Sequence, residues 1–169
     1  MLVSQEALRR VDGVNRISAA LIDDVALARE IKRGGHRIWL GHGHEVFSKR
    51  RYAGFSDVWE MIARTAYVQL GYSPRVLLGT CIGMLLVYVE PALASIFATG
   101  ALRWGGVACS IGMALAFQPT LRRYRRSSAW GLLLPVIGLF YLMATIGSAV
   151  MFYRGRGSQW KNRIYPAHW

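Results

Sequence analysis

The chain has 169 residues, the length of one ordinary domain, and carries 21 Lys and Arg against 9 Asp and Glu, a formal net charge of +12. Hydrophobic residues make up 53% of it, and its mean hydropathy is +0.25. Such an apolar mean excludes a disordered basic tail and argues against a soluble nucleic-acid-binding protein, so we expect no nucleic-acid partner. Basic residues beside apolar stretches are typical of membrane proteins that face anionic lipid.

The two parts of the chain differ in charge. Residues 1–75 carry 12 Lys and Arg against 8 Asp and Glu, whereas residues 76–169 carry 9 against the single acid Glu90. The first part has the charge balance of a soluble surface, and the second that of membrane spans with basic flanks. Cys81 and Cys109 lie in apolar runs, so neither a disulfide nor a redox motif is expected.

Short elements are predicted in the first 54 residues, which contain no signal peptide. A helix is predicted over 2–11, and a second between Ala20 and the glycine pair 34–35, where a helix can end. Segments 37–41 and 45–48 have the composition of short strands around a turn rich in glycine and histidine.

Two polar clusters in this region have alternative interpretations. Asp23 and Asp24 either cap the second helix or form a carboxylate pair in which one member serves as a base. His42 and His44, with His36 nearby, suggest either a metal site or a glycine-rich hairpin loop, and the loop is the default because flanking glycines oppose rigid coordination geometry. No metal ligand is assigned to this chain.

An amphipathic helix is predicted over 55–72, because apolar residues recur at steps of three and four. Trp59 and the tyrosines at its end favour a headgroup interface, so segment 55–75 is expected to lie on the membrane. Arg64 on this helix is suited to bind a phosphate, a lipid headgroup or Glu60 one turn back.

Three apolar blocks follow, at 76–98, 101–117 and 129–152. The first and third have the ~20 residues that a membrane-spanning helix needs, and the second is shorter. The loop between the last two holds four arginines and no acid, which favours a cytoplasmic position for it and for the N-terminal region. Three full crossings then place the basic tail, 154–169, on the opposite side, against the positive-inside rule. A re-entrant segment around Glu90 and Pro91, or around Pro135, would remove the conflict; the sequence leaves this open.

Taken together, these segments resemble the membrane-bound family 2 glycosyltransferases associated with bacterial hopanoid gene clusters. The resemblance rests, in order along the chain, on LIDDVALAREIKRGG at 21–35, RIWLG at 37–41, VWEMIARTAYVQL at 58–70 with Ser73 and Pro74, QPTLRRY at 118–124, and RGRGSQWKNRIY at 154–165. It implies a mainly α membrane protein with a small α/β remnant of a GT-A-type domain over 1–54, an interfacial helix over 55–75, about three spans within 76–153, and a location in the bacterial inner membrane.

The resemblance also implies a reaction. Asp24, with Asp23 beside it, would be the base that deprotonates a lipid or hopanoid-like acceptor, which then attacks the anomeric carbon of a nucleotide-sugar with inversion. Arg64 and Gln69 would contact the donor diphosphate or the acceptor. Of the family's Gln/Arg-x-x-Arg-Trp signature only Arg64 is matched, since Thr65 replaces the tryptophan. Membrane-interface anchors would be a set of aromatic and basic residues: Trp59, Arg122, Arg123, Trp160, Lys161 and Arg163.

The nucleotide-binding half of this family, with the Asp-x-Asp that holds Mg or Mn on the diphosphate, has no counterpart in the sequence. We therefore expect a truncated gene model, a split gene whose other half is a separate chain, or a degraded copy. In each case residues 1–169 hold no cofactor themselves and are not expected to catalyse the reaction alone. The competing interpretation is a non-catalytic, basic multi-pass membrane protein that binds anionic lipid or a partner subunit.

Overall fold

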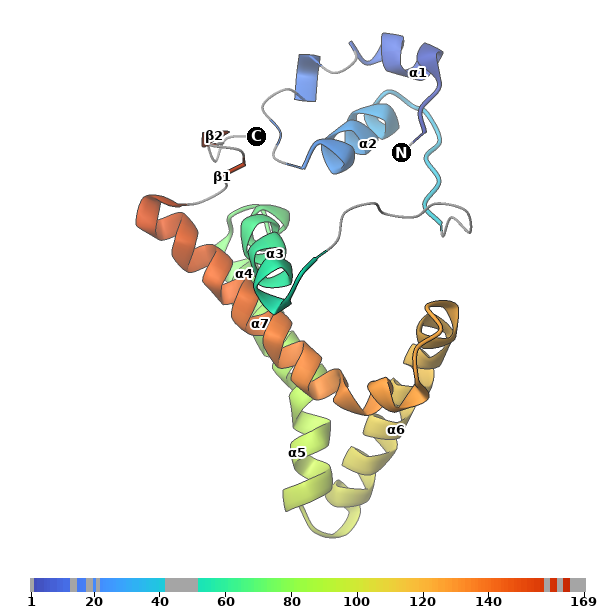
Figure 1. The fold of residues 1–169 in the computed structure, drawn as a ribbon, viewed down its shortest axis with the longest axis vertical. Helices are drawn as coiled ribbons and strands as arrows, with labels where there is room; N and C mark the ends of the chain where they lie inside the picture. Colours follow the sequence, from blue (N-terminus) through green and yellow to red (C-terminus); the bar gives the residue numbers. More distant parts are fainter. Residues whose placement is uncertain are drawn as a thin grey trace.

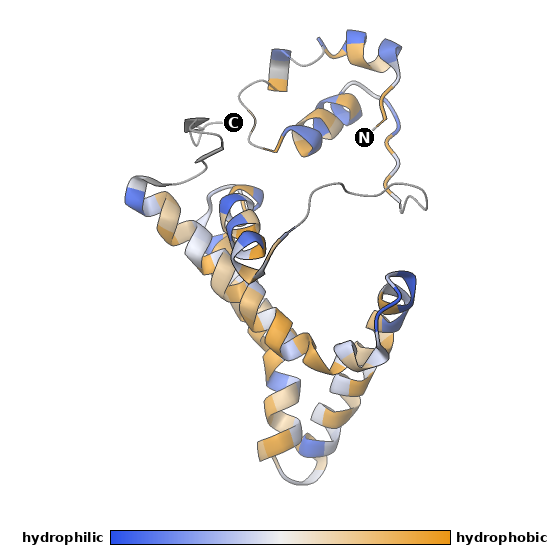
Figure 2. Ribbon diagram, viewed as in Figure 1, coloured by the Kyte–Doolittle hydropathy of each residue, from blue (hydrophilic) through white to orange (hydrophobic). Residues whose placement is uncertain are grey.

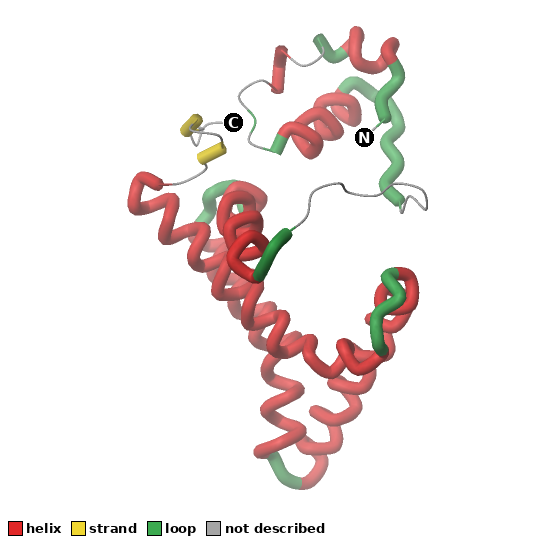
Figure 3. Tube along the Cα trace, viewed as in Figure 1, coloured by secondary structure: helices red, strands yellow, loops and turns green. Residues whose placement is uncertain are grey.

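The structure is a computed structural model, and it describes residues 2–12, 15–17, 20, 22–41, 52–156, 159–160 and 163–164. It is mainly helical (Figure 1; Figure 3). Within the described residues, sheet is limited to an antiparallel pair in the tail, β1 (Gln159–Trp160) and β2 (Arg163–Ile164), in which Trp160 pairs with Arg163.

The N-terminal region forms a small helical unit of its own. It consists of α1 (Gln5–Arg10), the 3₁₀ turn η1 (Asn15–Ile17) and α2 (Asp23–Arg33). Helix α2 ends as predicted at Gly34 and Gly35, and the φ of +80° at Gly35 is one that glycine adopts without a Cβ clash. The buried apolar side chains among the described residues of this unit are Ala7, Val11, Ile17, Ala20 and Ile31.

The prediction of a strand at 37–41 is wrong. Residues 36–41 form an extended segment that pairs with no strand, and Trp39 and Leu40 are almost fully exposed. A strand needs a neighbour to take up its backbone N–H and C=O groups, and none is present among the described residues. The second predicted strand, 45–48, lies outside the described residues. The N-terminal unit as described is therefore helical rather than α/β.

The predicted amphipathic helix is present as α3 (Phe55–Gln69), and its apolar side packs against α7 (Leu134–Met151). The two helices run in the same direction: Phe55 contacts Phe140 near the start of the contact, and Tyr67 contacts Ser148 near its end. Glycine at 147 allows the close approach, since a Cβ there would lie 3.1 Å from the Trp59 ring. The position of α3 at a membrane interface stays a prediction.

The next apolar stretch is one long helix with a π-helical turn in its middle. It comprises α4 (Pro74–Met84), η2 (Leu85–Val89) and α5 (Glu90–Phe97). The N–H of Glu90 donates to the carbonyl of Leu85, five residues back. Proline at 91 has no N–H to donate and its ring would clash with the carbonyl four residues earlier, so the wider turn accommodates it without breaking the helix.

A tight hairpin joins α5 to α6 (Gly100–Arg123), the two lying antiparallel. A Cβ on Gly106 would lie only 2.7–2.8 Å from atoms of Pro91, Ala94 and Ser95, so the backbones approach as closely as glycine permits. Toward its other end α6 diverges from α4 (Figure 1).

The chain then turns back along α6 before it enters α7. The 3₁₀ segment η3 (Ser128–Leu133) begins beside Gln118, whose side-chain amide donates to the Ser128 carbonyl at 3.3 Å. Gly131 lies against Ala114, one turn nearer the start of α6. From there α7 runs along η2 and α4, with Gly138 against Tyr88, and continues into the π turn η4 (Phe152–Arg156).

Three helical stretches are long and apolar enough to cross a membrane: Pro74–Phe97, Gly100–Arg123 and Ser128–Gly155. These stretches correspond to the spans predicted at 76–98, 101–117 and 129–152. The described chain is therefore mainly helical, with three candidate membrane helices. In the most apolar part of each stretch, 6%, 6% and 39% of the residues are buried inside the protein. The first two therefore present apolar surface outward, as lipid contact requires (Figure 2).

Candidate functional site

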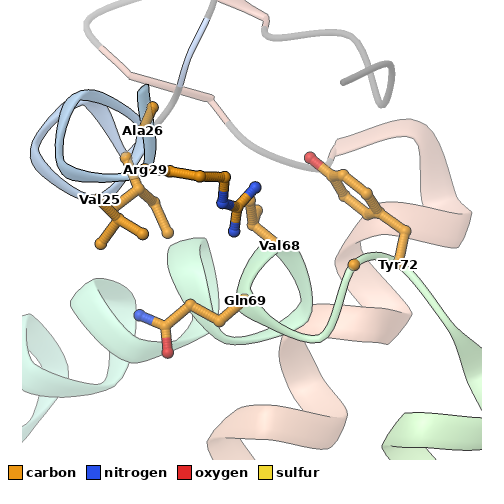
Figure 4. Close-up of a pocket in the computed structure, with 8 residues that line it drawn as sticks. Val25, Ala26, Arg29, Val68, Gln69 and Tyr72 are labelled. Atoms are coloured by element: carbon orange, nitrogen blue, oxygen red, sulfur yellow. The ribbon is translucent and has the colours of Figure 1, made fainter. Parts of the chain in front are cut away.

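A cavity of about 630 Å³ lies between α2 and the end of α3, a size typical of small-ligand sites. One wall comes from α2 and the other from the end of α3 and the turn that follows (Figure 4). Its lining combines apolar side chains with an arginine, an amide and a tyrosine: Ile22, Val25, Ala26, Arg29, Val68, Gln69, Gly71 and Tyr72.

The turn after α3 places Tyr72 at this cavity. The N–H of Tyr72 donates to the carbonyl of Tyr67 at 3.1 Å, and Gly71 and Tyr72 have φ of +61° and +55°. A left-handed conformation costs a non-glycine residue roughly 1–2 kcal/mol. Ring contacts offset this cost, because the Tyr72 ring lies 4.7 Å from that of Phe152 and 5.7 Å from that of Tyr67. Strain held in place by packing is a feature of functional sites.

Tyr67 anchors this turn to the end of α7. Its side chain is 1% exposed, and its hydroxyl lies 2.8 Å from the Tyr72 carbonyl and 3.0 Å from the Tyr153 hydroxyl. Since Tyr67 has one O–H and a carbonyl only accepts, Tyr67 donates to Tyr72 and accepts from Tyr153. Burial, and then the hydrogen bond and charge of Tyr153, raise the pKa of Tyr67 to about 12.

Arg29 supplies the positive charge of the cavity. Its side chain reaches from α2 toward the end of α3, with Tyr72 on the far side (Figure 4). None of the described residues that line the cavity is acidic, and a guanidinium can bind a carboxylate, a phosphate or the hydroxyls of a sugar.

The predicted carboxylate pair lies on α2 but outside the cavity lining. Asp23 and Asp24 occupy the first turn and are exposed, and the helix cap is Ile22 rather than either acid. Each Oδ1 accepts from the N–H of the next residue, at 2.9 Å in Asp23 and 2.8 Å in Asp24. Both are therefore surface carboxylates beside Ile22 and Val25, which do line the cavity.

Of the other predicted contact residues, Gln69 lines the cavity and Arg64 does not. Arg64 is half-buried one turn earlier on α3. The structure thus brings Gln69 together with Arg29, which sequence reasoning did not single out. The spacing Val25–Arg29 would have indicated it, since residues four apart share one face of a helix.

The predicted membrane anchors are in different settings. The Trp59 ring packs edge-on against Phe140, 5.7 Å between centroids, so it contacts α7. Arg122 and Arg123 are exposed at the end of α6. Trp160 and Arg163 belong to β1 and β2, and Lys161 lies outside the described residues. Their role as anchors stays a prediction.

His42 and His44, part of the predicted metal alternative, lie outside the described residues. Within the part of the chain that the structure describes, no group of three or more His, Cys, Asp or Glu side chains is placed to hold a metal ion.

No protein-family model, curated protein or solved structure matches the chain.

Proposed function

We propose that the chain is the acceptor-binding, membrane-embedded part of an inverting family 2 glycosyltransferase that transfers a sugar from a nucleotide-sugar to a lipid alcohol of hopanoid type. It would act in the inner membrane of a bacterium. The sequence resemblance suggests the reaction class, and the cavity between α2 and α3 is the observation that supports a site for the acceptor.

The position of this cavity suits an amphiphilic acceptor. Tyr72 lies two residues before Pro74, where the first apolar helix begins, so the cavity adjoins the end of the candidate membrane helices. Valines 25 and 68 give it an apolar side for the lipid body, while Arg29, Gln69 and the Tyr72 hydroxyl offer polar groups for a hydroxylated end.

In the proposed reaction Asp24 takes the proton of the acceptor hydroxyl. The acceptor oxygen forms a bond to the anomeric carbon as the bond from that carbon to the nucleotide diphosphate breaks, and the configuration inverts. The exposed position of Asp24 on the turn of α2 next to the cavity wall is compatible with this role. Arg29 would orient the acceptor, since guanidinium N–H groups have fixed directions.

The nucleotide-binding half, with the divalent metal that neutralises the departing diphosphate, is proposed to lie outside residues 1–169. Residues 38–40 mark a surface for it. Ile38, Trp39 and Leu40 are 49%, 84% and 99% exposed in an extended segment that pairs with no strand among the described residues, as suits a strand that joins the sheet of that half.

A chromosomal substitution tests the proposal in the cell that encodes the protein. With Asp24→Asn, lipid analysis by mass spectrometry is expected to show loss of one glycolipid and accumulation of its unglycosylated acceptor, as in a deletion strain. Glu6→Gln is the matched control, because it removes an exposed carboxylate of α1 that pairs with Arg10 on the surface. It is expected to leave the lipid profile unchanged. An unaltered glycolipid profile in the deletion strain would exclude the reaction.

The second candidate is a non-catalytic membrane protein that binds anionic lipid. The exposed arginines at the end of α6 favour it. It predicts that deletion changes no glycolipid, so the same experiment separates the two candidates.

A further inference from the structure

We infer that the arginines of the membrane helices form a single surface that binds anionic lipid headgroups of one leaflet, because Ser128–Gly155 re-enters the membrane instead of crossing it. The inference does not depend on the proposed enzymatic activity. It rests on where α7 begins and ends relative to the α5–α6 hairpin.

The turn of the α5–α6 hairpin is the point from which distances along the membrane helices are measured. This turn, at residues 98 and 99, separates two helical stretches of 24 residues each, Pro74–Phe97 and Gly100–Arg123. At about 1.5 Å per residue each is about 36 Å long, enough to cross a hydrocarbon core of about 30 Å. Since the two run antiparallel, Pro74 and Arg123 lie at the same end, far from the turn.

The segment after α6 starts at that same end and goes only part of the way down. Gly131 lies against Ala114 and Gly138 against Tyr88, and these partners are about 22 Å and 15 Å of helix from the hairpin turn. The bend at Leu133 and Leu134, followed by Pro135, reverses the chain there. The contacts of this segment nearest the hairpin turn thus lie about halfway along the α4–α5 and α6 helices.

From this bend α7 returns to the end where it started. The Phe152 ring lies 4.7 Å from that of Tyr72, directly before α4. The end of α7 is therefore level with the start of α4, and Figure 1 shows β1 and β2 beyond it. Strands β1 and β2, the end of α6 and the α2–α3 cavity all lie at one end of the helices.

Nearly all the positive charge of the helical region gathers at this end. Arg75 stands at the start of α4 and Arg154 at the end of α7, and both are exposed. Four more exposed arginines lie in the last turn of α6 or directly after it: Arg122, Arg123, Arg125 and Arg126. Arg103 alone, of the arginines in 74–155, lies near the hairpin turn. Figure 2 shows the ends of α6 and α7 as hydrophilic and the helices between as apolar.

Anionic phospholipid is the partner that this surface fits. Its arginines lie at the level where apolar helices end, and the only acid after residue 75 is Glu90. Near a membrane surface each arginine contributes about 1 kcal/mol toward anionic lipid, and the excess of arginines places this end in the cytoplasm. One side then holds the basic clusters of the described residues from 74 to 155, as the positive-inside rule requires.

Cysteine labelling tests the topology in the full chain, with Cys81 and Cys109 replaced by alanine. Single cysteines at Thr99, Ser127 and Arg154 are treated with a membrane-impermeant maleimide in right-side-out and inside-out vesicles. We expect Ser127→Cys and Arg154→Cys to react only in inside-out vesicles, and Thr99→Cys only in right-side-out ones. Reaction of Arg154→Cys from the Thr99 side would overturn the inference.

Lipid selectivity tests the partner. In nanodiscs, the share of spin-labelled phosphatidylglycerol held at the protein is compared with that of phosphatidylcholine. Replacing Arg122, Arg123, Arg125 and Arg126 by glutamine is expected to lower the phosphatidylglycerol preference at least about twofold, while Arg103→Gln leaves it unchanged. Persistence of the preference in the fourfold variant, or stronger competition by inorganic phosphate than by chloride at equal ionic strength, would reject a lipid surface.

Discussion

The hydroxyl groups of Tyr67 on α3 and Tyr153 in η4, directly after α7, lie 3.0 Å apart, and the Tyr67 hydroxyl also donates to the Tyr72 carbonyl. This pair joins the helix that walls the cavity to the helix that carries the tail. Together with the bond from the Tyr67 N–H to Ser148 Oγ, it fixes the end of α3 on α7.

The Tyr67 titration gives the first prediction. Its pKa is raised from 10 to about 12, so the folded state holds this proton more tightly than the unfolded state. The stability that results is fully present below pH 10 and is lost as the pH rises from 10 to 12. Absorbance at 295 nm should show one tyrosine ionising late, together with loss of thermal stability. Tyr67→Phe should remove this late step; its persistence would assign it to another tyrosine.

Tyr153→Phe is expected to move the pKa of Tyr67 only part of the way back to 10, because burial is the largest cause and remains. The lost hydrogen bond should lower the free energy of unfolding by about 1 kcal/mol. The same absorbance titration, with thermal unfolding in detergent, checks both effects. A full return to 10 would show that Tyr153 and not burial dominates.

Two adjacent glycines on α6 give a matched pair for packing. Alanine at 106 would place its Cβ 2.7–2.8 Å from backbone and side-chain atoms of α5, whereas nothing lies within 4 Å of a Cβ at 105. Gly106→Ala should therefore destabilise the hairpin by about 1–3 kcal/mol, the usual cost of overpacking. Gly105→Ala should be neutral or slightly stabilising. Midpoints of thermal unfolding in detergent compare the two, and equal midpoints would contradict the close contact.

A second matched pair concerns two non-glycine residues whose backbone is in the left-handed region. Arg125 (φ +52°) and Tyr72 (φ +55°) each stand after a helix end. Arg125 is exposed, so Arg125→Gly should relieve the strain and stabilise by about 1 kcal/mol. Tyr72→Gly relieves the same strain but deletes the ring that packs on Phe152, so it should destabilise. The sign of each shift in Tm is the test.

Filling the cavity tests its role in the proposed function. Ala26→Trp places a large ring between α2 and α3, and we expect at least tenfold less glycolipid with the Tm of the protein unchanged. Ala28→Trp, on the same helix but outside the cavity lining, is the control for Ala26→Trp. Arg29→Gln should weaken acceptor binding, raising KM for the acceptor more than it lowers kcat. Normal glycolipid levels in Ala26→Trp would remove the cavity from the acceptor path.

Local patterns predicted the helices well, because their causes are local. The apolar period of 55–72 appears as α3, and the glycines at 34 and 35 end α2. Apart from residue 98, the apolar blocks lie within the three candidate membrane helices. Helix α6 runs through Pro119 to Arg123, beyond the predicted 117. Its last turn is basic, and positive side chains are favourable at the C-terminal end of a helix. The glycosyltransferase resemblance stays a prediction.

Contacts between distant segments were beyond the sequence. The cavity joins Arg29 to Tyr72, more than 40 positions apart, and no periodicity links them. The same holds for the reversal at Leu134: Pro135 marked a possible bend, but only the contact of Gly138 with Tyr88 gives its depth. The strand at 37–41 failed because strand formation depends on a neighbour and not on composition alone.

The π turn at Leu85–Val89 also acts as a change of phase. In an uninterrupted helix Tyr88 and Pro91 share a face, but here Tyr88 meets Gly138 of α7 while Pro91 and Ala94 meet Gly106 of α6. One extra residue in a turn rotates everything after it by about 100° about the helix axis. A single helix can thus hold two partners that approach from different directions. If one residue were deleted from this turn, the side of the helix that contacts α7 and the side that contacts α6 would coincide. Helices α6 and α7 could then no longer both pack against it.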